Sequence, residues 1–137
     1  MNIEAIADFI IKYSPKNKEK TLYTEKDREK IKEIIVKHIY YKTCVIFSDL
    51  DGIVSICRFN MSPSGKVARI LDIIIHPKYR EKDLMRKMLL KGLRIFPQGE
   101  FIEFERSFVE NDKGFRSYPI KKFLRFLGRK KQGGISV

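Results

Sequence analysis

The stretch IIIHPKYREKDLMRKMLL, residues 73–90, constrains the fold more than any other part of the chain. An isoleucine run, typical of a buried strand, ends at Pro77; a cluster of charges follows, and then leucines and methionines recur at helical spacing. A strand therefore passes into a helix through a short cationic turn. Such a junction is either an ordinary strand-to-helix connection or a cradle for an anion, because a helix N-terminus presents unpaired backbone N–H groups.

Two helices are predicted before this junction. The first spans Ile3–Tyr13, where apolar residues recur along one face, and the dipeptide Ser14-Pro15 ends it. Residues 16–20 are expected to form a charged loop. The second helix begins at Thr24, in the capping-box-like sequence Thr-Glu-Lys-Asp, and runs to about Ile39.

Three strands are then expected in an antiparallel meander. Thr43–Ser48 and Ile53–Asn60 are rich in β-branched and aromatic residues. The Asp-Gly pair at residues 51–52 favours a tight hairpin between them, because glycine takes the positive φ that such a turn requires. A second turn, Met61–Gly65, leads to the third strand, Lys66–Ile75.

The elements after the junction complete the predicted order. A helix is expected from Pro77 to about Phe96, followed by a strand over Phe101–Phe108 and a loop over Asn111–Gly114. Pro119 suits the first turn of a last helix, which is expected to end at Gly128, before a basic C-terminal tail of residues 128–137.

The predicted order is therefore α-α-β-β-β-α-β-α, in one domain of residues 1–137. A right-handed crossover through the third helix makes the third and fourth strands parallel. The expected fold class is α+β: a mixed, mostly antiparallel sheet flanked by helices.

Charge is the most unusual feature of the composition. The chain has 29 basic and 17 acidic residues among 137, a formal charge of +12, which predicts attraction to polyanions such as nucleic acid or an acidic protein. Its hydrophobic fraction of 43% is that of a globular protein. No apolar run approaches the ~20 residues that span a bilayer, so we expect no membrane insertion, and the acidic N-terminus favours a cytoplasmic protein over a secreted one.

Cysteine and histidine give little indication of chemistry. Cys44 and Cys57 lie in the first two predicted strands, where we expect them to face the same way as free, buried thiols. His38 and His76 have no spacing typical of a zinc site, so no metal is expected.

The element order, with LDIIIHPKYREKDLMRKML at its centre, resembles the GNAT superfamily of acyl-CoA-dependent N-acetyltransferases. The third meander strand of that superfamily ends in a hydrophobic-x-Pro-x-Tyr-Arg signature, and Ile75-His76-Pro77-Lys78-Tyr79-Arg80 matches it. The similarity extends over residues 24–127 in topology, whereas the motif is confined to the quoted segment.

The resemblance implies an enzyme that transfers an acetyl group from acetyl-CoA to an amine-bearing substrate. The end of the third strand would contact pantetheine through the backbone, and the following loop and helix start would turn amide N–H groups onto the pyrophosphate. The implied cofactor-binding residues are Ile73, Ile75, Arg80, Glu81, Lys82, Asp83, Leu84, Met85, Arg86, whose side chain would add a charge, and Asn111 after the fourth strand.

The phosphate loop departs from the pattern of the superfamily, which is Arg/Gln-x-x-Gly-x-Gly/Ala. Arg80 matches the first position, but Asp83 and Met85 replace the two small residues. A carboxylate ~4 Å from a phosphate would cost about 1 kcal/mol in water and about 4 kcal/mol at partial burial. Asp83 has an alternative role, because aspartate is a preferred N-cap and its carboxylate could accept from the N–H of Met85 or Arg86.

Three residues are candidates for catalysis. Tyr118 follows Asn111 by seven residues, the spacing at which members of the superfamily carry a tyrosine that protonates the departing thiolate; alternatively, Tyr118 packs beside the helix start. Asp72, which interrupts an apolar strand, and Glu103 are the carboxylates nearest the predicted cleft, where a base would deprotonate the amine. Alternatively, Asp72 pairs with Arg69 and Glu103 lies on a solvated strand face.

A second function remains open at the level of sequence. The high positive charge and the altered phosphate loop also fit a non-catalytic module of the same fold that engages nucleic acid or an acidic protein. The chain is short for the superfamily after its last helix, so the strands that usually complete the acceptor site are expected to be missing or supplied by a partner, as in a homodimer.

Overall fold

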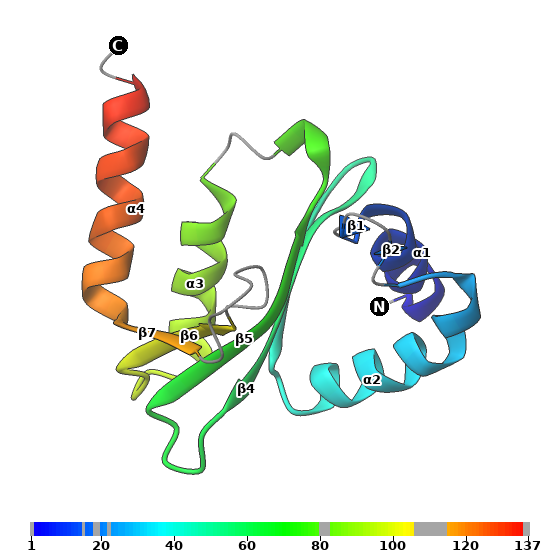
Figure 1. Ribbon diagram of the computed structural model, residues 1–137, viewed down its shortest axis with the longest axis horizontal. Coiled ribbons are helices and arrows are strands. Elements are labelled where there is room, and N and C mark those ends of the chain that lie inside the picture. Colours follow the sequence, from blue (N-terminus) through cyan, green and yellow to red (C-terminus); the bar gives the residue numbers. More distant parts are fainter. Residues whose placement is uncertain are drawn as a thin grey trace.

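The computed structural model describes residues 2–14, 16–17, 20–21, 23–79, 83–105 and 115–135. Their centre is a five-stranded sheet with the order β3-β4-β5-β6-β7. Helices α1 and α2 cover one face of the sheet, and α3 and α4 cover the other (Figure 1). The predicted α+β architecture, with helices on both faces of a mixed sheet, is confirmed.

The first layer consists of α1, Ile3–Tyr13, and α2, Arg28–Tyr40. A capping box is present at Thr24, and its reciprocal contact is the hydrogen bond from the backbone N–H of Thr24 to the Asp27 carboxylate over 2.9 Å. The first turn of the helix predicted from Thr24, however, is the 3-10 helix η1, Glu25–Asp27.

The segment expected as a charged loop contains two short strands. They are β1, Lys16–Asn17, and β2, Lys20–Thr21, which pair antiparallel. The expectation of a loop is wrong here, because a strand of two residues is too short to produce the alternation by which strands are recognised.

The predicted meander is confirmed. Strands β3, Cys44–Asp49, β4, Gly52–Met61, and β5, Val67–Ile75, are antiparallel neighbours. The turn between β3 and β4 ends at Gly52, whose φ of +131° is a conformation that L side chains rarely adopt.

The two cysteines are free, as expected, but they face opposite sides of the sheet. Cys44 lies opposite Arg58, and Cys57 lies opposite Val45, in the register of β3 and β4. Side chains alternate along a strand, so Cys44 packs beneath α1 and α2 whereas Cys57 packs beneath α3 and α4. The expectation that they face the same way is wrong.

The far side of the sheet contains one strand more than predicted. As expected, β6, Phe101–Glu105, is parallel to β5. Next to it lies β7, Phe115–Pro119, antiparallel to β6. A strand was not expected there because Pro119 is typical of a helix start; at the last position of this strand its missing N–H is tolerated.

The second helix layer begins after the 3-10 turn η2, Pro77–Tyr79. It consists of α3, Leu84–Ile95, and α4, Ile120–Ile135. The predicted end of the last helix at Gly128 is wrong, since α4 continues through it; glycine within a helix costs about 1 kcal/mol but does not prevent it.

The two layers enclose separate hydrophobic cores. The core beneath α1 and α2 contains Ile6, Ile10, Ile35, Ile56 and Ile74. The core beneath α3 and α4 contains Val45, Phe59, Met88, Ile102 and Ile120, and it holds an apolar cavity of about 40 Å³. Among the described residues, none of the helices has the length and apolar character to cross a membrane.

Candidate functional site

The carboxyl end of β5 extends beyond its described pairing with β6. β5 and β6 are in register over only four pairs, from Val67 opposite Phe101 to Ile70 opposite Phe104. Beyond Ile70, β5 continues for five residues, paired with β4 on its other side, whereas β6 ends at Glu105. Within the described residues, β6 therefore does not cover the last part of β5.

A β-bulge sets which side chains of β5 face each helix layer at this end. Arg58 lies opposite Asp72 and Phe59 opposite Ile70, so Leu71 is an extra residue in β5. As a result Ile70, Ile73 and Ile75 all pack on the α3 side. The run does not alternate in the sequence because helices cover both faces of β5, and Ile74 packs in the core beneath α1 and α2.

The turn that follows β5 is anchored on two sides. The His76 N–H donates to the Val54 carbonyl over 2.8 Å, and the Lys78 N–H donates to His76 Nδ1 over 3.1 Å. The His76 ring packs on Tyr13 of α1, with 4.6 Å between ring centroids. The Pro-x-Tyr part of the signature is thus a firmly held turn directing the chain toward α3.

The signature tyrosine holds this turn to the hairpin between β3 and β4. The Tyr79 hydroxyl donates to the Asp49 carboxylate, which also accepts from the Asp51 N–H over 2.8 Å. Both hydrogen bonds lower the pKa of Asp49, and the one from Tyr79 has the larger effect. The neighbouring carboxylate in turn raises the pKa of Tyr79. Tyr79 therefore has a structural function in this turn.

The N-terminus of α3 lies at the same end of the molecule as the end of β5 (Figure 1). Asp83 is the N-cap residue, as the alternative interpretation predicted, but its side chain makes no capping hydrogen bond. The predicted capping contact is wrong: the Asp83 carboxylate does not occupy the amides of the first turn. Those amides are the groups that bind anions at a helix N-terminus.

Three other predicted cofactor residues lie in the first turn of α3. Leu84 is buried and Met85 is partly buried. Arg86 approaches α4 near Gly128, and its Nε is buried without a hydrogen-bond partner among the described residues. A buried, unpaired guanidinium N–H is costly, so this donor favours a negatively charged partner.

Asp72 lies in a buried polar cluster with Arg58 and Tyr23. Arg58 Nε lies 3.0 Å from each Asp72 oxygen, and a terminal guanidinium nitrogen of Arg58 is 2.8 Å from the Tyr23 hydroxyl. The side chains of Arg58 and Asp72 are only 8% and 10% exposed. Two charges this deeply buried are stable only as a pair, so the geometry gives Asp72 a structural partner rather than a free carboxylate.

The alternative that Asp72 pairs with Arg69 is wrong. Arg69 Nε instead lies 3.3 Å from the Glu103 carboxylate. Asp72 and Arg58 face each other across two strands, as do Arg69 and Glu103, and such neighbours are about 5 Å apart. Three positions along one strand amount to about 10 Å, which places Arg69 farther from Asp72 than Arg58 is.

The electrostatics of this cluster are consistent with a closed, structural network. Burial raises the pKa of the Tyr23 hydroxyl, and it lowers the pKa of His38, which nearby Arg58 lowers further. Burial works against the charge on Arg58, but the hydrogen bonds to Asp72 and Tyr23 and the charge attraction to both together outweigh it and raise the pKa of Arg58.

The three candidates for catalysis do not converge. Glu103 and Tyr118 lie in the paired part of the sheet, opposite Arg69 and Ile102 respectively. The Tyr118 ring packs on Phe123, with 5.5 Å between centroids, as the packing alternative predicted. Asp72 lies beneath the other helix layer, so the catalytic roles of all three stay predictions.

The predicted residues Arg80, Glu81, Lys82 and Asn111 lie outside the described part of the chain. Arg58 and Tyr23, in contrast, were missed by the sequence analysis. Arg58 is a single charge within an apolar strand, and so is Asp72 in the next strand. Pairing these two interruptions would have identified the buried ion pair.

A second hollow lies away from this site. An open groove of about 670 Å³ is lined by Lys37, His38, Tyr41, Asn60 and Phe96, among others. His38 Nδ1 is 2.7 Å from the Thr43 hydroxyl, so the imidazole is already engaged. The groove has no carboxylate among its lining residues and does not adjoin the end of β5.

Comparisons with known proteins give matches at the level of structure. A protein assigned to the GNAT family of acetyltransferases from Desulfovibrio desulfuricans matches with a TM-score of 0.56 and 13% identity, over 93% of this chain and 79% of its own. A GNAT-like decarboxylase in complex with isobutyryl-CoA matches with a TM-score of 0.52 and 14% identity, over 74% of this chain and 60% of its own. A chimeric spermidine N-acetyltransferase from Vibrio cholerae matches with a TM-score of 0.50 and 14% identity, over 74% and 64%.

The chain spans less than two thirds of the length of the latter two proteins. No family model matches the sequence, and no curated protein matches it. At such identities structural similarity shows the fold alone: the chain has a GNAT-like α+β fold.

Proposed function

We propose that this chain binds acetyl-CoA between the end of β5 and the N-terminus of α3 and transfers the acetyl group to an amine. The observation that carries the proposal is that, within the described residues, β6 pairs with β5 only as far as Ile70, at the same end of the molecule as a helix N-terminus that the Asp83 carboxylate does not cap (Figure 1). A strand edge that its neighbour does not cover offers backbone groups to the amides of pantetheine, and the helix start suits a pyrophosphate.

The predicted cofactor-binding residues have separate parts in this proposal. The backbone of β5 around Ile73 would contact pantetheine, and Ile75 stays a predicted contact. The amides of Asp83, Leu84 and Met85 would receive the pyrophosphate, and Arg80, Glu81 and Lys82, which lie outside the described residues, stay predicted contacts. The fit is supported by Arg86, whose buried Nε has no partner among the described residues and would gain one. Asn111 stays a predicted contact.

Acetyl-CoA supplies an activated acyl group, held as a thioester. The amine nitrogen attacks the thioester carbonyl carbon, a C–N bond forms, and the C–S bond breaks; the thiolate takes up a proton and the substrate ammonium has lost one. This chain's contribution would be to orient the thioester and the amine, which by itself supplies a large part of the rate enhancement.

Binding and thiol release test the proposal. We expect calorimetry to show acetyl-CoA binding, and a panel of polyamines and amino acids to include one that releases free CoA thiol. Arg86→Gln should weaken binding about tenfold, since charge-assisted hydrogen bonds to phosphate contribute ~1.5–3 kcal/mol. Arg94→Gln, an exposed arginine at the other end of α3, is the matched control. Absence of binding at millimolar acetyl-CoA would end the proposal.

A second candidate is a non-catalytic module of the same fold that engages a polyanion. It is favoured by one observation, namely that Asp72, Glu103 and Tyr118 do not converge on one point. Binding of acetyl-CoA without thiol release toward any amine, together with binding to a polyanion, would favour this candidate over the enzyme.

A further inference from the structure

The layer formed by α3 and α4 contains only basic charges. Neither helix has an acidic residue, and within the described residues no ion pair involves their basic side chains. The basic residues are Arg86, Lys87, Lys91 and Arg94 in α3, and Lys121, Lys122, Arg125, Arg129, Lys130 and Lys131 in α4. The layer therefore presents a strong positive potential to solvent.

One aromatic side chain lies exposed among these charges. Phe126 of α4 is 57% exposed, and it is one helical turn from Lys122 and adjacent to Arg125. Its ring lies 6.4 Å from that of Phe123, which packs in turn on Phe104 at 5.3 Å. Phe126 is thus supported from below by a packed aromatic cluster, so a flat ligand would meet a surface that is already ordered.

The residues Lys121, Lys122, Arg125 and Phe126 are called the α4 surface below. All three cations are exposed. Helix α4 has 16 residues, which at ~1.5 Å per residue makes it about 24 Å long. That length accommodates several consecutive phosphates of a nucleic-acid strand.

The apolar face of α4 argues against a membrane as the partner. Ile120 is only 7% exposed, and Phe123 and Leu124 pack against the core beneath the helix. A helix that binds a bilayer inserts such a face into the acyl boundary, but here the sheet already covers it. An acidic protein fits less well too, because a stable protein interface has an apolar centre and the described part of α4 exposes one large apolar side chain.

We infer that the α4 surface docks single-stranded nucleic acid, with Lys121, Lys122 and Arg125 on its phosphates and a base stacked on Phe126. Exposed aromatic rings among cations are how proteins hold single strands without sequence preference. The inference goes beyond acetyl transfer and does not depend on it, since none of these residues belongs to the proposed acetyl-CoA site.

Fluorescence anisotropy with a short labelled oligouridylate, and with oligothymidylate of equal length, tests the inference on the full chain. We expect binding to at least one of the two that weakens steeply as salt rises. Lys122→Gln/Arg125→Gln should lower the affinity about tenfold. It should also reduce the slope of log affinity against log salt concentration by roughly 1.4, because each of the two lost phosphate contacts accounts for ~0.7 of that slope. Lys26→Gln/Lys30→Gln, which removes two exposed cations from the other layer, should change the affinity less than about threefold.

Phe126→Ala tests the stacking contact separately. It should lower the affinity about tenfold with the salt dependence unchanged, since stacking on one ring involves no phosphate. Tyr40→Ala is the matched control, because Tyr40 is an aromatic residue 78% exposed on α2.

In the absence of acetyl-CoA, four results would overturn the inference. They are no binding at low ionic strength, equal losses in the test and control variants, polyglutamate that competes as well as the oligonucleotide, and binding to anionic phospholipid vesicles without binding to oligonucleotide. A further arm includes saturating acetyl-CoA: persistence of oligonucleotide binding supports a separate surface, and its loss assigns the cations to the acetyl-CoA site and overturns the inference.

Discussion

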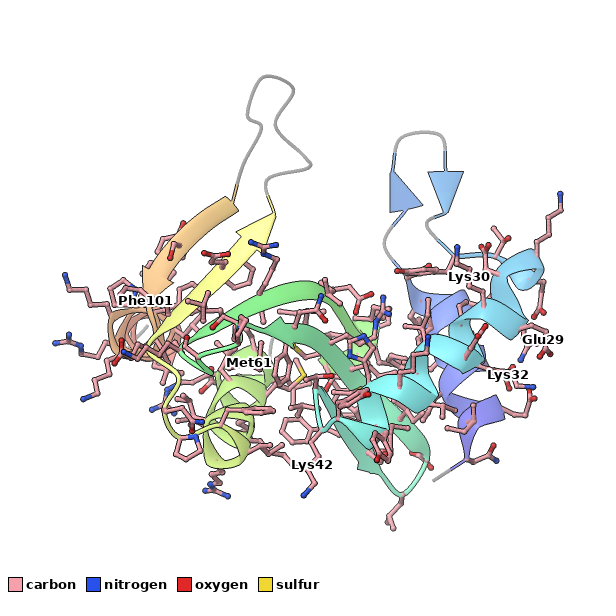
Figure 2. The ribbon with its side chains drawn as sticks, turned by 90° about the horizontal axis from the view of Figure 1, so that it is seen from below. Glu29, Lys30, Lys32, Lys42, Met61 and Phe101 are labelled. Atoms are coloured by element: carbon pink, nitrogen blue, oxygen red, sulfur yellow. The ribbon has the colours of Figure 1, made fainter. Side chains whose placement is uncertain are left out.

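The two helix layers of this protein treat charge in opposite ways. The layer of α1, η1 and α2 has six acidic residues (Glu4, Asp8, Glu25, Asp27, Glu29, Glu33) and six basic ones (Lys12, Lys26, Arg28, Lys30, Lys32, Lys37), and five ion pairs link them. Figure 2 shows Glu29, Lys30 and Lys32 along the outer side of α2. The layer of α3 and α4 has ten basic residues and no acid.

The difference supports the proposal that ligands bind to the layer of α3 and α4. In the first layer the charges neutralise each other, and the buried pair Arg58–Asp72 below it is closed by Tyr23. In the second layer the positive potential is left for an outside anion. Both the proposed acetyl-CoA site and the α4 surface lie on the second layer, which is why the overall charge of +12 is informative there and not elsewhere.

The largest expected effect is on stability beneath the first layer. Arg58→Ala leaves the Asp72 carboxylate buried and unpaired, and we expect a loss of about 3–5 kcal/mol in the free energy of unfolding, measured in urea. Arg69→Ala, which removes an exposed ion pair, should cost less than about 1 kcal/mol. Equal losses would mean that the buried cluster is not the closed network described above.

The second effect concerns ligand affinity at the start of α3. Asp83→Gly removes a carboxylate near the expected pyrophosphate and should tighten acetyl-CoA binding about fivefold, the equivalent of ~1 kcal/mol of repulsion in water. Asp83→Asn keeps the size but not the charge; weaker binding by both variants would show that the carboxylate assists the ligand.

The third effect concerns packing beneath the second layer. Gly92 lies in α3 beside the 40 Å³ cavity, and a Cβ there would meet no atom within 4 Å. Gly92→Ala should therefore raise the free energy of unfolding by about 1 kcal/mol through helix propensity. Gly99→Ala is the contrasting variant, because its Cβ would lie 3.3 Å from the Phe96 carbonyl oxygen, and no gain is expected.

The smallest effect is an acid transition in the first layer. Hydrogen bonds from Lys32 and Arg28 lower the pKa values of Glu4 and Glu25 below their ordinary 4.5, so the stability they contribute is present above about pH 4.5 and is lost as the pH falls below it. We expect Arg28→Gln/Lys32→Gln to lower the Tm at pH 6 slightly and to have less effect at pH 3. An undiminished difference at pH 3 would show that these exposed pairs contribute nothing.

Much of the fold follows from the sequence for physical reasons. Apolar periodicity predicted both helices of the first layer and the strands of the meander, and crossover handedness predicted the parallel pairing of β5 with β6. The strand β7 was not predicted because Pro119 is typical both of a helix start and of a strand end. The length of α4 was not predicted because glycine is typical of a helix end. Gly128 would end the helix only if the residues beyond it did not continue it.

The site was less predictable than the fold, because partners are set by register. The bulge at Leu71 directs Ile73 and Ile75 toward α3, and no local pattern signals it. Likewise, the carboxylate of Asp72 was expected near Arg69, but the cross-strand neighbour is Arg58. Asp83 at the N-cap position was predicted correctly, whereas the absence of its capping hydrogen bond depends on backbone geometry that the sequence does not show.

Hydrogen exchange with and without saturating acetyl-CoA tests the asymmetry between the layers most directly. We expect added protection at residues 71–75 of β5 and in the first turn of α3, with exchange in α1 and α2 unchanged. Protection confined to α2 and the His38 groove, or none anywhere under conditions in which the full chain remains folded, would contradict the assignment of the ligand to the α3 and α4 layer.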